Sequence, residues 1–363
     1  MGSERDKKNQ INPMTTAANT MSPVPPAANT MSPVAMRKSQ RKIKIIGETC
    51  RLFVGTRLAG PRAIAIVFYK SRREGQEMAK VAFLGLGVMG GPMAGHLVAA
   101  GHQVTVYNRT TAKAEAWVAA HGHAFGETPE KAVAGAEFVM TCVGNDDDLR
   151  AICAAAFPAM ARGATFVDHT TVSAKISREM AALAESMGLN YIDAPVSGGQ
   201  AGAVNGVLSI MCGGRPEVFE AAAPIMAAYG RICKLLGPAG AGQLAKMCNQ
   251  IAIAGVVQGL AESLHFAKSA GLDGAALVEV ISQGAAGSWQ MGNRAATMLA
   301  GEYDFGFAVD WMRKDLGIVL DAAEETGASL PLTALVDQFY KDVQKLGGGR
   351  WDTSSLLARL EKF

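Results

Sequence analysis

The stretch VAFLGLGVMGGPMAGHLVAAGHQVTVYNRTT, residues 81–111, decides the fold of this chain. An apolar run at 81–84 leads into a glycine-rich turn, which is followed by small residues at 92–100 and a second apolar run at 104–107. This order predicts strand, turn, helix and strand within the roughly thirty residues of a dinucleotide-binding βαβ unit. Because the N–H groups at the start of such a helix point at an anion, we expect the turn to bind a pyrophosphate. The residues expected to contact it are Gly85, Leu86, Gly87, Val88, Met89 and Gly90.

The same alternation of strands and helices continues after this unit. Apolar runs at 138–144, 165–168 and 191–193 predict further buried strands, with helices expected at 112–121 and 149–161. The fold class is therefore α/β, with an N-terminal Rossmann-type doubly wound sheet. Because ligands of such sheets bind at the carboxyl ends of the strands, we expect Val143, Gly144 and Thr171 to line the cofactor. Asp146–Asp148 are interpreted as a solvated helix start rather than a metal site, and no metal is expected.

The residues after the second strand bear on the choice of cofactor. NAD enzymes commonly place an acidic residue there to bind the ribose 2′-hydroxyl, whereas this chain has Asn108, Arg109 and Thr110. A carboxylate would repel a 2′-phosphate, but guanidinium and hydroxyl groups can bind one. We therefore favour NADP over NAD, with an ordinary exposed arginine as the alternative for Arg109.

The second half of the chain contains a lysine on a long predicted helix. A turn at 193–199, DAPVSGG, has backbone N–H groups and the Ser197 hydroxyl suited to a carboxylate. A helix expected over 242–270 is about 40 Å long at 1.5 Å per residue, enough to join two lobes. Lys246, Asn249 and Gln250 share one face of it. A desolvated lysine can exchange a proton with an alcohol oxygen, although a solvated helical lysine is the simpler alternative in isolation.

Four motifs in this order resemble the β-hydroxyacid dehydrogenase family, which includes 3-hydroxyisobutyrate dehydrogenases. They are GLGVMGGPMA at 85–94, DAPVSGG at 193–199, GAGQLAK at 240–246, and Phe307 with KDL at 314–316. The resemblance covers residues 78 to about 357. It implies a reversible hydride transfer between NAD(P) and a short β-hydroxyacid or semialdehyde acid, which we expect to be like that of 3-hydroxyisobutyrate dehydrogenase.

The resemblance also assigns roles to residues. Lys246 would be the general acid/base, and Ser197, Gly198 and Gly199 would bind the substrate carboxylate. Asn249 and Gln250 would contact the substrate, although the family commonly has Asn where this chain has Gln250. Phe307 and Asp315 would close over the substrate, Lys314 over the cofactor, and Thr171 would touch the nicotinamide end. The alternatives are an NADPH-dependent glyoxylate/succinic or tartronate semialdehyde reductase and, in a different class, a non-catalytic dinucleotide-binding scaffold.

The helical periodicity after residue 271 completes the predicted domain organisation. Segments at 272–284, 288–300, 307–327, 331–346 and 353–360 resemble the family's all-α C-terminal domain, joined to the sheet by the long interdomain helix. We expect a dinucleotide-binding domain at 78–240 and a helical substrate and dimerisation domain at 241–363. The resemblance implies a homodimer or homotetramer.

Composition separates residues 1–77 from the rest. Residues 1–79 contain fourteen Lys/Arg and five Asp/Glu, whereas the remainder contains 21 basic and 27 acidic residues. We interpret 1–77 as a disordered extension or a non-native start, with an organellar transit peptide or a basic nucleic-acid arm as weaker alternatives. The six scattered cysteines form no CxxC pair and favour a cytoplasmic protein. Neither a nucleic-acid partner nor a membrane partner is expected, because the body is acidic and no apolar stretch is long enough to span a bilayer.

Overall fold

The first βαβ unit is present as the sequence predicts. In the computed structural model, which describes residues 78–362, strand β1 (Lys80–Leu84) leads through the glycine turn to helix α1 (Gly90–Ala99) and strand β2 (Gln103–Tyr107). The two strands are parallel, and Val81 lies opposite Val104. The expectations for residues 1–77 concern a segment outside the described residues.

The sheet has nine strands in the described part of the chain. Their order is β3-β2-β1-β4-β5-β6-β8-β7, with β9 paired to β8. Strands β1 to β6 are all parallel, whereas β8 is antiparallel to β6 and β7. The order 3-2-1-4-5-6 is that of a doubly wound dinucleotide-binding sheet, which confirms the predicted fold class. The remaining strands are β3 (Ala124–Phe125), β4 (Phe138–Thr141), β5 (Thr165–Asp168), β6 (Asn190–Asp193), β7 (Val196–Ser197), β8 (Leu208–Gly214) and β9 (Gly230–Gly237).

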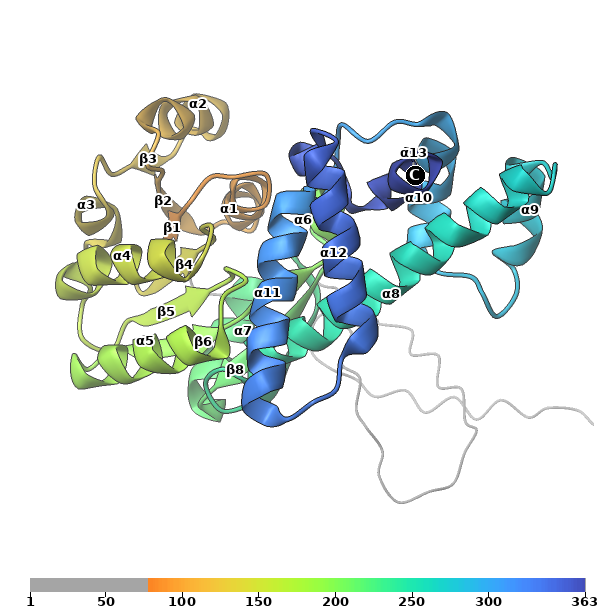
Figure 1. Cartoon of the computed structure of the whole chain (residues 1–363). Helices are drawn as coiled ribbons and strands as arrows, with labels where there is room; N and C mark the ends of the chain where they lie inside the picture. The colour runs from red at the N-terminus through yellow and green to blue at the C-terminus, as the bar shows by residue number, and fades with distance from the viewer. Residues whose placement is uncertain (1–77, 363) are drawn as a thin grey trace, which may run out of the picture. The chain divides into compact units, whose positions relative to one another are not determined.

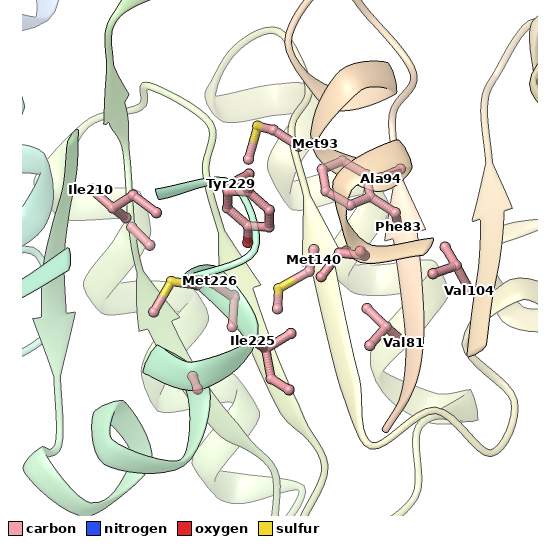
Figure 2. Packing of buried hydrophobic residues seen from close by; sticks show 14 of the residues in the cluster. Val81, Phe83, Met93, Ala94, Val104, Met140, Ile210, Ile225, Met226 and Tyr229 are labelled. Atoms are coloured by element: carbon pink, nitrogen blue, oxygen red, sulfur yellow. The ribbon is translucent and has the colours of Figure 1, made fainter. Parts of the chain in front are cut away.

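Successive residues of a strand point to opposite faces of the sheet, and apolar residues occur on both faces. Helices therefore cover both faces of this sheet. Val81 and Phe83 face one buried cluster, which Figure 2 shows with Met140 and Tyr229. Leu84 faces the other cluster. The helices of this region are α2 (Thr111–His121), α3 (Pro129–Val133), α4 (Asp146–Ala156), the 3-10 turn η1 (Phe157–Ala159), α5 (Ala174–Ser186), α6 (Gly199–Val204) and α7 (Pro216–Met226).

Several element boundaries differ from the prediction. Strand β4 ends at Thr141, not at residue 144, and α4 begins at Asp146 because the Asn145 side chain accepts a hydrogen bond from the Asp148 N–H at 2.8 Å. That geometry is an N-cap. The three aspartates therefore form the first turn of a helix, as expected. The sequence pattern gave no indication of β9, an edge strand in which no residue is buried.

The long helix α8 (Ala241–Ser269) follows the sheet and begins the helical region. Its 29 residues span about 43 Å at 1.5 Å per residue. It packs against β8 at one end and against the C-terminal helices over most of its length (Figure 1). The division at residue 240 stays a prediction. The remaining elements are α9 (Gly274–Ile281), α10 (Trp289–Ala300), α11 (Val309–Thr326), α12 (Pro331–Lys345), the turns η2 (Gly348–Arg350) and η3 (Thr353–Ser355), and α13 (Leu356–Lys362).

The helical region has a core of its own. Buried Leu260 and Leu264 of α8 pack with Leu316 of α11 and Val336 of α12, among others. The predicted helical ranges agree with the observed ones to within a few residues. Over residues 78–362, no helix combines the length and the apolar character needed to cross a bilayer.

Candidate active site

The glycine turn after β1 is built so that two of its positions accept only glycine. Gly85 has φ +101°, and a Cβ there would lie 2.3 Å from the carbonyl oxygen of Cys142. A Cβ at Gly90 would lie 2.0 Å from the carbonyl oxygen of Gly85. Gly87 is different, because a Cβ there would meet no atom within 4 Å. The first and third glycines therefore serve close packing, while the second leaves the backbone open to a ligand.

The start of α1 has the features of an anion site. No side chain caps this helix, and its first turn contains no acidic residue. The loop residue Val88 is 61% exposed, whereas Leu86 is buried. Since uncapped N–H groups and the helix dipole favour an anion, the turn fits the pyrophosphate of a dinucleotide.

Asn108 and Arg109, two polar residues after β2, differ in how firmly their side chains are held. Asn108 accepts a hydrogen bond from the Leu86 N–H at 3.0 Å and donates one to the Thr110 carbonyl at 3.0 Å. Its amide therefore holds the glycine turn against the end of β2. The Arg109 side chain is 86% exposed and, within residues 78–362, pairs only with Asp148, at 3.3 Å. Of the two, the guanidinium is the group that can move to a ligand without breaking a buried contact.

The loops after β4 and β5 are held together and to α11. The Val143 N–H donates to the Thr170 hydroxyl at 3.0 Å. Lys314 of α11 donates from Nζ to the carbonyl oxygens of Gly144, at 3.1 Å, and of Thr171. The structure thus brings together the three residues predicted to line the cofactor, Val143, Gly144 and Thr171, and a lysine predicted from a distant motif.

Two buried carboxyl groups lie beneath these loops. Asp168 and Asp193 are register partners at the ends of β5 and β6, and both side chains are fully buried. Burial raises the pKa of Asp168 to about 7 and that of Asp193 to about 6, because desolvation disfavours the charged form. Asp193 also accepts hydrogen bonds from the N–H groups of Gly240, at 2.8 Å, and Gln243, at 3.0 Å. It therefore caps the start of α8 from the end of the sheet.

Lys246 lies buried one turn inside α8. Its side chain is 7% exposed, and among residues 78–362 it forms no hydrogen bond or ion pair. Desolvation lowers its pKa, the charge of Asp315 opposes this shift, and Lys314 adds to it. A buried lysine with no partner of its own gives up its proton more readily than a solvated lysine does.

A chain of polar side chains joins the sheet to α8 and α11. The Ser197 hydroxyl donates to Asn249 Oδ1 at 3.1 Å, and Asn249 Nδ2 donates to Gln250 Oε1 at 2.8 Å. Gln250 Nε2 in turn donates to Asp315 Oδ2 at 2.6 Å. Asp315 Oδ1 lies 3.1 Å from Lys314 Nζ. Residues predicted separately from three motifs therefore form one continuous network.

The network limits what Gln250 can do. Its amide oxygen accepts from Asn249, and its amide nitrogen contacts both Asp315 and, at 3.6 Å, the Met312 sulfur. Binding a substrate hydroxyl would require one of these contacts to break. The predicted substrate role of Gln250 stays a prediction, and its observed role is to join α8 to α11.

Other predicted residues lie beside this network without joining it. Phe307 donates its N–H to Asp352 at 2.8 Å, and its ring packs against the core of the helical region. Gly198 and Gly199 have φ +133° and +60° and turn the chain into α6, which begins at Gly199. Their roles toward a substrate stay predictions. In the part of the chain from 78 to 362, no group of three or more His, Cys, Asp or Glu side chains could hold a metal ion.

One buried residue was missed by the sequence analysis. Gln243 is fully buried and contacts the loop of Thr171. Gln243 stands three residues before Lys246 in the GAGQLAK motif, so their common helix face was the available signal. The role of Asp193 as the cap of α8 had no local signal, because the two are 47 residues apart in the sequence at the closest contact.

Comparison with protein-family models gives two adjacent matches. Residues 80–237 match the NAD binding domain of 6-phosphogluconate dehydrogenase. Residues 240–360 match the NAD-binding domain of NADP-dependent 3-hydroxyisobutyrate dehydrogenase. Together the matches include every predicted site residue, from the glycine turn to Asp315.

Individual relatives agree with these matches. An uncharacterized oxidoreductase of Shewanella frigidimarina is 63% identical over 78% of this chain and 99% of its own length. A probable 3-hydroxyisobutyrate dehydrogenase-like protein of Arabidopsis thaliana is 38% identical over 78% of this chain and 86% of its own. The structure of 3-hydroxyisobutyrate dehydrogenase from Mycobacterium tuberculosis with L-serine matches with a TM-score of 0.71 and 33% identity, covering 78% of this chain and 99% of that one. With its nucleotide-binding sheet, its long connecting helix and these relatives, the chain belongs to the β-hydroxyacid dehydrogenase family of NAD(P)-binding oxidoreductases.

Proposed function

We propose that this protein reversibly transfers a hydride between NAD(P) and a short β-hydroxyacid or its semialdehyde, with Lys246 as the general acid/base. The observation that carries the proposal is the buried Lys246 side chain, whose amine has no hydrogen-bond or ion-pair partner among residues 78–362 and which lies on the same helix as Asn249 and Gln250 of the polar network. A non-catalytic scaffold has no need of a buried ionisable group, whose desolvation costs stability.

Lys246 moves the proton in this mechanism. When bound, the nicotinamide dinucleotide supplies or accepts the hydride at C4 of its ring. In the direction of reduction, Lys246 donates its proton to the carbonyl oxygen as that oxygen becomes a hydroxyl. In oxidation, the neutral amine removes the hydroxyl proton. Since burial lowers the pKa of Lys246, oxidation can proceed at a lower pH than an ordinary lysine would allow.

Ser197, Gly198 and Gly199 would position the substrate by its carboxylate. The Ser197 hydroxyl already donates to the Asn249 oxygen and can turn to an anion at the same place. L-Serine, present in the mycobacterial relative's structure, is a carboxylate with a hydroxymethyl group on C2. A substrate of this size, with the hydroxyl on the carbon next to C2, suits a carboxylate anchor close to a single proton donor.

The cofactor preference follows from Arg109. In the part of the chain that the structure describes, its exposed guanidinium is paired only with Asp148 on the surface, so it is available to a 2′-phosphate. Asn108 and Thr110 at the same strand end bear no charge that would repel one. We therefore favour NADP, with NAD as the alternative.

A second copy of the chain would cover the apolar surface of the helical region. Phe266 is 71% exposed and Val280 is 72% exposed, and α9 has no fully buried residue although it is mostly apolar. Helices α8, α9 and α10 contact one another, so these side chains form one region. Exposed apolar surface of this extent is typical of an interface, and a homodimer or homotetramer accounts for it. The predicted cytoplasmic location stays a prediction from the cysteine pattern.

Steady-state kinetics test the proposed function. The enzyme would be assayed with 3-hydroxyisobutyrate, L-serine, tartronate semialdehyde, glyoxylate and succinic semialdehyde, each with NAD(H) and NADP(H). We expect turnover with at least one of them and a higher kcat/KM with the phosphorylated cofactor. Absence of turnover with every pair, in a protein that binds the cofactor, would favour the scaffold alternative.

A further inference from the structure

Gln243 is the buried residue that connects the helix of Lys246 to the loop of Thr171. It lies in the first turn of α8, is 0% exposed, and precedes Lys246 by three residues. Residues separated by three positions share one helix face. Both ends of its side-chain amide are used on the loop after β5.

The contacts of Gln243 enclose Thr171. Gln243 Oε1 accepts the N–H of Val172 at 3.2 Å, and Nε2 donates to the carbonyl oxygen of Thr170 at 2.8 Å. These atoms belong to the two peptide groups on either side of Thr171. One amide side chain therefore determines the orientation of both peptide planes.

Independent contacts hold the remaining atoms of this arrangement. The backbone N–H of Gln243 donates to Asp193 Oδ2 at 3.0 Å, which anchors the start of α8 to the end of β6. The carbonyl oxygen of Thr171 accepts from Lys314. The peptide group between Thr171 and Val172 is thus bound at its N–H by α8 and at its oxygen by α11. The Gln243 and Asp193 side chains in this arrangement are both fully buried.

We propose that Gln243 is a positioning residue, which sets the distance between the Lys246 amine and the nicotinamide ring by locking the Thr171 loop to α8. The inference rests on the proposed function for the placement of the ring beside Thr171. Both polar ends of the Gln243 side chain are bonded to the loop backbone, so we expect Gln243 to act through the loop and the helix. A misplacement of about 1 Å at such a site is enough to cost on the order of a hundredfold in rate.

Gln243→Glu separates the two hydrogen bonds. The glutamate keeps the shape and one acceptor for the Val172 N–H, but an ionised carboxylate cannot donate to the Thr170 oxygen. A protonated carboxyl group can donate, so activity should return as the pH falls. Several charged or titratable groups lie around this position. They are Asp193 on β6, Asp168 at the end of β5, His169 after it, Arg178 on α5, Lys246 on α8 and Lys314 on α11.

The experiment uses the full chain with Gln243→Glu, Gln243→Ala and the control Gln258→Ala. Gln258 is another buried glutamine of α8, about 22 Å further along the helix, and its amide donates to Glu262. For each protein, kcat, KM and the isotope effect with C4-deuterated cofactor are measured from pH 6 to pH 9. Hydrogen exchange of the Val172 amide is followed on the same proteins.

The expected results distinguish positioning from simple stability. Gln243→Ala should lower kcat by about tenfold to a hundredfold, with an increased isotope effect and little change in the KM for the cofactor. The ratio of Gln243→Glu to Gln243→Ala activity should rise as the pH falls, whereas Gln258→Ala should resemble the wild type. The Val172 amide should lose protection only in the Gln243 variants. The ratio cancels the titration of Asp168 and Asp193, which occurs in both variants.

Several outcomes would overturn the proposal. An unchanged kcat, a ratio independent of pH, or unchanged protection of the Val172 amide would each contradict the proposed clamp. If Gln243→Ala fails to fold, Gln243→Glu compared with the wild type decides the question. If the wild type turns over no substrate, the proposed function fails, while the exchange of the Val172 amide still decides whether Gln243 holds the loop.

Discussion

The glycine turn and the polar network that runs from Ser197 to Lys314 are built in different ways. The turn uses six consecutive residues, and the groups that we propose to bind the pyrophosphate are backbone N–H groups at the start of α1. The network uses side chains from β7, α8 and α11, whose positions in the sequence run from 197 to 315. A site made of backbone depends on local conformation, whereas a site made of distant side chains depends on the packing of whole elements.

The largest effect is expected when the proposed proton donor is removed and the glycine turn is left intact. Lys246→Ala should lower kcat by about a hundredfold to ten-thousandfold, the usual contribution of a general acid/base. The dissociation constant of the cofactor, measured by quenching of protein fluorescence, should change little. Lys268→Ala, at an exposed lysine of the same helix, is the control. A kcat within tenfold of the wild type would refute the role of Lys246.

A smaller effect is expected from the turn itself. Gly90→Ala places a Cβ where the Gly85 carbonyl oxygen lies 2.0 Å away, so overpacking should reduce the free energy of unfolding by about 1–3 kcal/mol and weaken cofactor binding. Gly91→Ala is the matched control, since its Cβ would meet no atom closer than 4.0 Å. There the higher helix propensity of alanine should stabilise the protein by up to about 1 kcal/mol. Chemical denaturation of the two variants measures both changes, and equal effects would contradict the packing argument.

The pH dependence of stability tests the junction between the two regions. Burial raises the pKa of Asp168 from 3.8 to about 7, so between these values the folded protein holds a proton that the unfolded chain has released. The contribution of this carboxyl group to stability is complete below pH 3.8 and is lost as the pH rises through 7.

Asp168→Asn cannot titrate, and its stability relative to the wild type should therefore increase as the pH rises. The size is about 1.4 kcal/mol for each tenfold difference in proton affinity between the folded and unfolded states. Urea denaturation at pH 5 and pH 8 gives this difference. His169, whose pKa burial lowers to about 4, titrates with the opposite sign in both proteins and cancels. A difference that is constant with pH would show that Asp168 is ionised throughout.

The smallest effect concerns the choice of cofactor. Arg109→Ala should reduce kcat/KM with NADPH by about threefold to tenfold and leave NADH little affected, because one exposed charge-assisted contact is lost. Arg150→Ala, another exposed arginine in surface ion pairs, is the control. An equal loss with both cofactors would show that Arg109 does not bind the 2′-phosphate.

The elements and the glycine turn could be predicted because their signals are local. An apolar run, glycines at fixed spacing and helical periodicity each act within one or two turns of the chain. The edge strand β9 was missed because none of its residues is buried, so it lacks the apolar run by which the buried strands were predicted. Strand β4 was predicted three residues too long because Cys142 and Val143 are apolar, although Val143 already bonds to the Thr170 hydroxyl.

The candidate site was predicted residue by residue but not as a network. The motifs identified Ser197, Asn249, Gln250 and Asp315 separately, and only the packing of α8 against α11 places Gln250 Nε2 2.6 Å from Asp315. The same packing uses both ends of the Gln250 amide in hydrogen bonds within the protein, whereas the sequence predicted that this amide contacts the substrate. Phe307 is a different case. Its motif predicts that it closes over the substrate, whereas the structure shows only its backbone N–H bound to Asp352 and its ring against the helical core.

The sequence by itself determined the nucleotide-binding unit, the order of the elements and the identity of the candidate proton donor. Each of these depends on neighbouring residues or on a residue type at one position. The tertiary structure alone decided that Lys246 is buried with no partner among residues 78–362, that Asp193 caps α8, and that Gln243 and Lys314 hold the same peptide group from two helices. Burial and hydrogen bonding between elements depend on how separate segments pack, and no local pattern in the chain contains that information.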